Sequence, residues 1–117
     1  MDCEKADKSA LDACMGRCQK LVSLVEYAAD SIVSKTILDK PVGTITLFAF
    51  DKGQKLSEHT AAYDAVVQVI SGSAHITIDG QNITVSAGEV IIMPANVPHA
   101  VSAADEKFKM LLIMIRN

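Results

Sequence analysis

From residue 32 onward the chain is a succession of short runs rich in β-branched residues, separated by turn residues at close spacing. This pattern is typical of an all-β sandwich or barrel, because each run has the length of one strand and each turn reverses the chain. Asp79-Gly80 predicts a two-residue hairpin, since glycine readily adopts the positive φ that such a turn needs. About eight strands are predicted, at 32–38, 44–50, 64–70, 74–78, 82–86, 89–93, 99–103 and 108–115.

Two of the predicted strands indicate how the sheets are covered. In the run 74–78 apolar and polar residues alternate, which places His75 on the polar, outer face. The run from Met110 to Ile115 contains no polar residue, as expected of a strand that is covered on both faces. Its second face therefore needs a cover, and the N-terminal segment or a second subunit could supply it.

The first thirty residues follow a different pattern, and we expect an α-helical extension (residues 1–30) ahead of a barrel domain (residues 31–117). Ser9 and Asp12 resemble a capping box, so the helix is expected to begin near Ala10. Gly16 costs about 1 kcal/mol relative to alanine, which favours a short or split helix. The apolar stripe at helical spacing consists of Leu11, Cys14, Met15, Cys18, Leu21, Val22 and Val25.

Length and charge narrow the class of protein. A chain of 117 residues is long enough for one domain with its own core. Acidic residues outnumber the scattered lysines and arginines, with a net charge of −3, which disfavours nucleic-acid binding. No apolar run approaches the roughly 20 residues of a membrane helix. The charged N-terminus lacks the apolar region of a signal peptide, so we expect a cytoplasmic protein.

The three cysteines, Cys3, Cys14 and Cys18, are an odd number close to one end of the chain. This distribution is unlike a secreted disulfide framework, so we expect reduced thiols. Cys14 and Cys18 lie one helical turn apart, which would suit a redox or metal site with Cys3 as a third partner. Because they coincide with the apolar stripe, packing is the favoured interpretation.

Two histidines lie in glycine-framed stretches of the second half of the chain. The two frames are Gly53-x5-His59-x12-Gly72 and Gly88-x5-Pro94-x4-His99. With about eight predicted strands, these frames make the chain resemble the cupin superfamily, whose small members are single jelly-roll barrels. The resemblance spans residues 32–115. It implies a cupin jelly-roll barrel and, as in many small cupins, a homodimer.

The two cupin motifs are usually written G-x5-H-x-H-x3,4-E-x6-G and G-x5-P-x-G-x2-H-x3-N. In members with complete motifs, three histidines and a glutamate would hold a transition metal at the mouth of the barrel. Here Ala61 and Ala65 stand at the second histidine and the glutamate. An alanine methyl has no lone pair, so the resemblance carries over only His59 and His99 as metal ligands. The other departures from the motifs are Asn96 and Ala103.

A further metal ligand could come from another nearby residue. The nearby donors by sequence or strand position are Glu58, Asp64, Gln68, Met93, Met110 and Met114. Asp64 and Gln68 have the opposite strand parity to Ala65, so in a regular strand they point away from its side chain, and a β-bulge would reverse this. Met110 and Met114 share one strand face and are interpreted as core packing.

Two functions from different classes follow. The first is a binding module in which His59, His99, Tyr63 and Met93 line a pocket for a small polar ligand, with no cofactor required. The second is a metal-dependent cupin enzyme of the dioxygenase or isomerase type, with a divalent transition metal on a reduced ligand set. No nucleophile elbow, phosphate loop or dinucleotide fingerprint is present, so the sequence identifies no catalytic residue and leaves open whether the protein is an enzyme.

Overall fold

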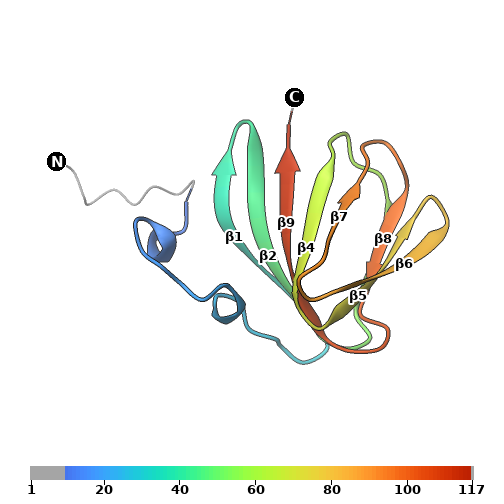
Figure 1. The fold of residues 1–117 in the computed structure, drawn as a ribbon, viewed down its shortest axis with the longest axis horizontal. Helices are drawn as coiled ribbons and strands as arrows, with labels where there is room; N and C mark the ends of the chain where they lie inside the picture. The colour runs from blue at the N-terminus through green and yellow to red at the C-terminus, as the bar shows by residue number, and fades with distance from the viewer. Residues whose placement is uncertain (1–9, 117) are drawn as a thin grey trace.

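The computed structural model describes residues 10–116, which form two facing β-sheets preceded by an irregular segment (Figure 1). The larger sheet has the strand order β1-β2-β9-β4-β7, and the smaller has the order β3-β8-β5-β6. All paired neighbours are antiparallel, which confirms the predicted all-β barrel. The strands are β1 (Ile32–Lys40), β2 (Gly43–Phe50), β3 (Lys55–His59), β4 (Ala65–Ser71), β5 (Ser73–Ile78), β6 (Gln81–Ser86), β7 (Val90–Met93), β8 (His99–Ser102) and β9 (Phe108–Ile115).

The predicted strands correspond to all of these except β3, which the sequence pattern did not predict. β3 lies at the edge of the smaller sheet and pairs only with β8. Leu56 is its one half-buried residue, and the other positions are exposed. A strand with so little buried surface has almost no hydrophobic period, so its register is set by its partner strand.

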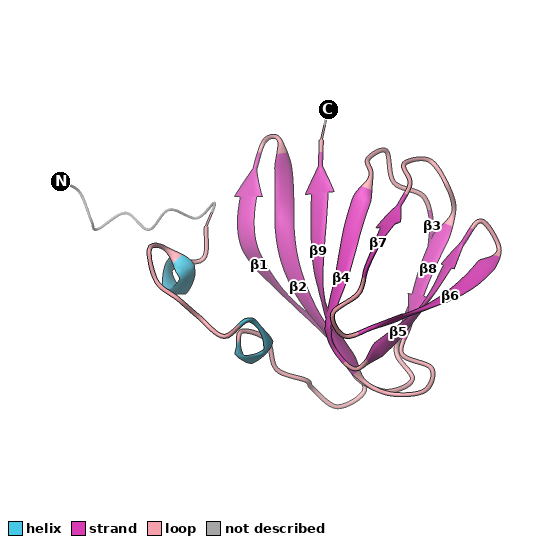
Figure 2. Cartoon of the chain, in the orientation of Figure 1, coloured by secondary structure: helices cyan, strands magenta, loops and turns pink. Residues whose placement is uncertain are grey.

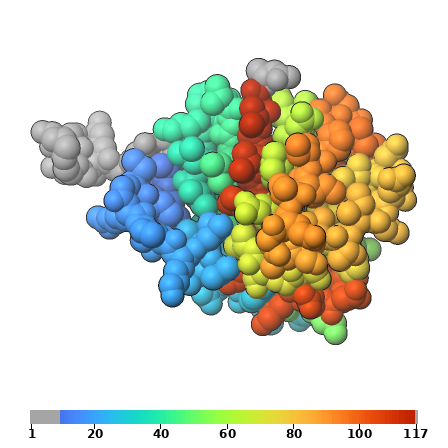
Figure 3. Space-filling view, viewed as in Figure 1, coloured from blue at the N-terminus to red at the C-terminus, as the bar shows by residue number. Residues whose placement is uncertain are grey.

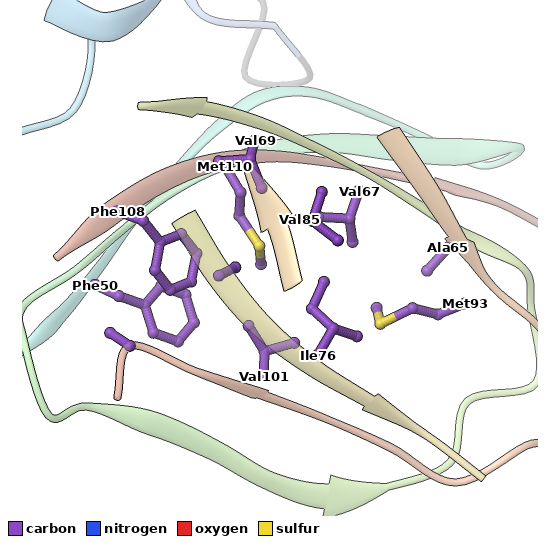
Figure 4. Close-up of a cluster of buried hydrophobic side chains, with 12 residues drawn as sticks. Phe50, Ala65, Val67, Val69, Ile76, Val85, Met93, Val101, Phe108 and Met110 are labelled. Atoms are coloured by element: carbon purple, nitrogen blue, oxygen red, sulfur yellow. The ribbon is translucent and has the colours of Figure 1, made fainter. Parts of the chain in front are cut away.

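The core lies between the two sheets and is built from the alternate, inward-facing residues of the strands (Figure 4). Phe50 and Phe108 stack at its closed end, with ring centroids 4.5 Å apart. Ile76 of β5 and Val67 of β4 are fully buried from opposite sheets. Each such side chain that is removed from water contributes about 1.5–3 kcal/mol to the free energy of unfolding. The packing of the two sheets against each other is therefore the main stabilising contact.

Turn chemistry accounts for two of the sharpest reversals. Asp79 and Gly80 both have positive φ, of 49° and 82°, and join β5 to β6 as the predicted hairpin. Gly72, between β4 and β5, has a φ of 74°. A Cβ atom at Gly72 would also overlap the carbonyl oxygen of Lys107. The glycine that closes the first frame is therefore required by both backbone conformation and space.

The predicted α-helix at the N-terminus is wrong. The segment ahead of β1 is extended, with two short 3-10 turns at Asp12–Cys14 and Leu21–Ser23 (Figure 2). Gly16 lies between them with a φ of 66°, which ends helical geometry. The predicted capping residue Ser9 and the thiol of Cys3 lie outside the described residues, whereas Cys14 and Cys18 are free thiols. The apolar residues of this stretch recur at helical spacing, but they do not form an α-helix.

Tertiary packing explains this path, because Leu21, Leu24, Val25 and Tyr27 pack on the outer face of the larger sheet. Val25 is 2% exposed and packs against Leu47 and Ala49 of β2, which are fully buried. Lys109 of β9 donates a hydrogen bond from Nζ to the Val22 carbonyl oxygen (2.6 Å) and lies over the Tyr27 ring. The N-terminal segment therefore covers part of the outer face of β9. It is one of the two covers predicted from the sequence, but it is extended and not helical.

That cover is partial. Towards the C-terminal end of β9, the outer face of the larger sheet keeps exposed apolar side chains, including Val42, Ile92 and Ile115. A hollow of about 310 Å³ lies there between the β1–β2 hairpin and β9.

Among residues 10–116, no helix is long and apolar enough to cross a membrane.

Candidate functional site

The ends of several strands from both sheets meet at one end of the barrel, where Figure 2 shows the ends of β4, β7 and β9 along the upper rim. β3 ends at His59 and β8 begins at His99, and these two residues pair directly. In the larger sheet, Ala65 at the start of β4 pairs with Met93 at the end of β7 and with Met114 of β9. A histidine row (His59 and His99) and a methionine row (Met93, Ala65 and Met114) therefore lie at the same end of the two sheets.

A small cavity, the barrel pocket, lies between these rows and has a volume of about 90 Å³. His59, His99, Met93, Met110 and Met114 line it, and all of its other lining residues are aliphatic. Pockets for drug-sized ligands have volumes of about 300–1,000 Å³. The barrel pocket therefore suits an occupant of only a few atoms.

The two imidazoles have the same orientation relative to their own backbones. His59 Nδ1 lies 2.7 Å from the carbonyl oxygen of Ser57, and His99 Nδ1 lies 3.1 Å from that of Val97. A carbonyl oxygen can only accept, so both Nδ1 atoms carry the proton and donate. In each neutral ring Nε2 is then an acceptor, and neither Nε2 has a hydrogen-bond partner among residues 10–116. The ring centroids are 4.5 Å apart, with an interplanar angle of 70°.

The two histidines differ in burial. His99 is 3% exposed, whereas His59 lies at the solvent-exposed rim. Burial lowers the pKa of His99, because desolvation disfavours the protonated ring. The hydrogen bond to Val97 acts in the opposite direction, and the neighbouring His59 lowers the pKa further. His99 is therefore neutral at physiological pH, with a free lone pair on Nε2.

Tyr63 lies apart from the other predicted pocket residues. It lines a hollow of about 300 Å³ on the outside of the barrel, with Val66, Ile92 and Ile115. The structure thus brings His59, His99 and Met93 together but separates Tyr63 from them. Tyr63 lies in the loop before β4, where strand parity gave no reliable direction for its side chain.

Comparison with known proteins agrees with this geometry. A family model described as a cupin domain matches residues 46–116, which include both glycine frames and both histidines. The chain belongs to the cupin family.

Three proteins that are similar to this cupin have names that state no activity. A conserved protein of unknown function from Streptococcus pyogenes has a solved structure with a TM-score of 0.87 and 34% identity, covering 97% of this chain and 98% of that one. A cupin 2 conserved barrel domain protein from Leptotrichia buccalis is 44% identical with a TM-score of 0.80, over 82% of this chain and 46% of that one. An uncharacterized protein from Streptomyces coelicolor is 33% identical over 70 residues, which are 60% of this chain and 67% of the relative.

The complete cupin set of nitrogen and oxygen ligands does not fit this site. Ala65 is 1% exposed and presents a methyl group where the family motif has a carboxylate, and Ala61 lines the same pocket. Among residues 10–116, no group of three or more His, Cys, Asp or Glu side chains is placed to hold a metal ion. Divalent ions that require such donors have only the two imidazoles here.

The nearby oxygen donors do not compensate. Asp64 Oδ1 accepts a hydrogen bond from the backbone N–H of Ala95 (2.8 Å), so this carboxylate is engaged with the loop that follows β7. Gln68 and Glu58 are exposed, and neither lines the barrel pocket. The strand-parity argument against Asp64 and Gln68 agrees with this placement.

Met110 and Met114 were interpreted from the sequence as core packing, and the structure places both there: Met110 is 1% exposed in the core between the sheets and Met114 packs against that core. Both also line the barrel pocket. The available signal was that they share a strand face, but only the pairing of β9 with β4 places Met114 beside Ala65. Thioethers at a pocket wall are therefore a product of strand register.

His75, the third histidine, lies on the outer face of the smaller sheet, as predicted. Its Nε2 is 2.6 Å from Asp105 Oδ2, and its Nδ1 is 3.3 Å from the Thr84 hydroxyl. This surface cluster is remote from the pocket lining. His75 therefore serves as a matched control for changes at His59 and His99.

Proposed function

We propose that this cupin is a binding module whose barrel pocket holds a small polar ligand on the Nε2 atoms of His59 and His99. The observation that carries the proposal is the pair of identically anchored imidazoles. Each Nδ1 donates to a backbone carbonyl two residues earlier, and each Nε2 is left without a partner among the described residues. An otherwise apolar pocket with two convergent polar groups is the usual form of a small-ligand site.

The hydrogen bonds of the rings narrow the class of ligand. A neutral ring that donates through Nδ1 offers a lone pair on Nε2, which suits a group that accepts an electron pair: a hydroxyl or N–H hydrogen, or a cation. Carbonyl and carboxylate groups only accept hydrogen bonds, and a neutral ring tied through Nδ1 has no free donor for them. The volume of about 90 Å³ limits the buried part of the ligand to a few atoms.

The exposure of the histidines gives the site a simple architecture. His59 is at the open rim and His99 is buried, so a ligand can enter past His59 and be desolvated against His99. Because both rings are held by their own backbone, little side-chain freedom is lost on binding.

A ligand screen by thermal unfolding tests this proposal. Small diols, hydroxy acids and amines, and separately metal salts, are added to untagged protein, to His59→Ala and to His75→Ala. A ligand present at one hundred times its Kd is expected to stabilise the native protein by about 2.7 kcal/mol. We expect His75→Ala to respond like the native protein and His59→Ala to lose most of the effect.

Two results would contradict the proposal. The first is that no compound of these classes shifts the unfolding temperature. The second is that the shift is the same in His59→Ala as in the native protein, because binding would then lie elsewhere on the molecule.

A further inference from the structure

The methionine row supplies a second kind of electron-pair donor to the pocket. Met93 and Met114 flank Ala65 in adjacent strands of the larger sheet, and the histidine row lies on the opposite sheet. Figure 4 shows Met93 extending into the interior beside Ala65 and Ile76. Met93 is 4% exposed, so its thioether sulfur is excluded from bulk water. Met93, Met114 and the two histidines all line the same cavity of about 90 Å³.

This combination of donors is selective. Thioether sulfur is a soft ligand that favours Cu(I), and imidazole binds copper as well. Hard ions such as Mg²⁺, Ca²⁺ and Mn²⁺ require oxygen ligands, and none of the residues that line the pocket carries a side-chain oxygen. The alanines that remove the family's second histidine and glutamate leave the thioethers as the additional donors.

The charge of the ion matters as much as the softness of the ligands. Thioethers carry no charge and imidazole binds a metal in its neutral form, and among residues 10–116 no acidic side chain lines the pocket to offset a positive charge. The cost of desolvating an ion rises with the square of its charge, so a divalent ion is penalised about four times as much as a monovalent one of equal size. An apolar pocket with neutral donors therefore favours a monovalent cation.

The imidazoles are already arranged as metal ligands. Histidines that bind metals commonly donate the other ring N–H to a backbone carbonyl or carboxylate, which fixes the tautomer and the ring orientation. His59 and His99 both do so through Nδ1, with centroids 4.5 Å apart. In both rings the Nδ1 hydrogen bond therefore fixes the tautomer that leaves Nε2 to the metal.

We propose that His59, His99, Met93 and Met114 form a binding site for a Cu(I) ion. This inference rests on the proposed function, since it identifies the occupant of the same pocket. Met110 also lines the pocket, but it pairs with Val69, whereas Met114 pairs with Ala65 in the row that faces the histidines. We therefore assign Met110 to the pocket wall and no direct bond to the ion.

The cysteines have to be removed from the test, because thiolates bind Cu(I) strongly. Cys14 is half-buried and Cys18 exposed, and both are free. The experiment therefore uses the full chain with Cys3→Ser, Cys14→Ser and Cys18→Ser, purified without a histidine tag. Cu(I) is titrated anaerobically, with ascorbate as reductant, against a chromophoric Cu(I) chelator.

We expect one Cu(I) per chain. The Met93→Leu/Met114→Leu double variant should lose at least about tenfold in affinity, and His59→Ala should lose a similar amount or more. Leucine preserves the volume of methionine, so the double variant should remain folded, as circular dichroism can verify. Met15→Leu, at an exposed methionine, and His75→Ala should bind as the parent does. X-ray absorption of the complex should show both nitrogen and sulfur ligands, and Zn²⁺ should not displace Cu(I).

Failure of this inference is distinguishable from failure of the proposed function. If the cysteine-free protein binds no Cu(I), or if the double variant binds it as tightly as the parent, the Cu(I) site is wrong. A hydroxyl- or amine-bearing ligand that still stabilises the protein through His59 would then keep the binding function intact. If neither Cu(I) nor any such ligand depends on His59, both are overturned.

Discussion

His59 and His99 pair directly across β3 and β8, and their rings meet edge to face with centroids 4.5 Å apart. Forty residues of sequence separate them, so the contact depends entirely on the antiparallel pairing of an edge strand with its neighbour. Because each ring is tied to its own backbone through Nδ1, the pair presents two fixed acceptors to the pocket.

The burial of His99 predicts that stability falls in mild acid. The pKa of His99 is lowered in the folded state, mainly by desolvation. Above the unfolded pKa of about 6.5, both states are neutral. As the pH falls through that value, the unfolded state takes up the proton more readily, so the free energy of unfolding decreases. Urea unfolding between about pH 8 and pH 5 should show this loss, and His99→Gln should reduce it. An unchanged slope in His99→Gln would show that other groups cause the pH dependence.

The N-terminal cover predicts unequal effects for two valines of the same segment. Val25 is 2% exposed against β2, whereas Val22 is 41% exposed. Val25→Ala should lower the free energy of unfolding by about 2 kcal/mol, from lost burial and a residual cavity. Val22→Ala should change it by less than about 0.5 kcal/mol. Chemical denaturation measures both, and equal effects would contradict the packing of this segment on the sheet.

The close approach at Gly72 predicts a loss of stability that exceeds ordinary backbone strain. Gly72 and Gly80 both have positive φ, but only at Gly72 would a Cβ meet backbone atoms, namely the Lys107 carbonyl oxygen. Gly80→Ala should cost about 1–2 kcal/mol from conformation alone. Gly72→Ala should cost clearly more, because the β4–β5 turn must also move away from residue 107. Matching melting temperatures for the two variants would argue against this contact.

The homodimer expected from the resemblance to small cupins stays a prediction, and the uncovered part of the larger sheet offers a place to test it. Val42, Ile92 and Ile115 are exposed on that face, and apolar patches of this kind mark contact surfaces. Sedimentation velocity should show a concentration-dependent dimer, and Ile115→Lys should shift it towards monomer. Met15→Lys changes an exposed apolar residue of the N-terminal segment and should leave the dimer intact. A monomer at all concentrations would refute the prediction.

The β-strands with buried faces were predictable from sequence because their signal is local. Runs such as 108–115 carry their own hydrophobic pattern, and Asp79-Gly80 encodes its own turn. β3 was missed because an exposed edge strand has little pattern of its own. The N-terminal helix was wrong because helical apolar spacing does not require a helix. The extended segment buries Val25 of the predicted stripe and leaves Val22 and Met15 of the same stripe exposed.

The same distinction between local pattern and tertiary contact holds for the candidate site. The glycine frames identified His59 and His99, and their spacing is a property of the chain alone. The direction of the loop before β4 decides on which side of the barrel Tyr63 lies. The pairing of β9 with β4 decides that Met114 lies beside Ala65.

By itself, then, the sequence determined the strands other than β3, the Asp79-Gly80 turn, the family resemblance and the two histidines, since all of these are expressed in residues close together along the chain. The tertiary structure alone decided three features: both Nε2 atoms lack a hydrogen-bond partner among residues 10–116, Met93 and Met114 flank the alanine in place of the family's glutamate, and the N-terminal segment is an extended cover. The physical reason is that strand register and hydrogen-bond partners are settled by contacts between distant segments, and a local pattern does not encode which segment arrives opposite another.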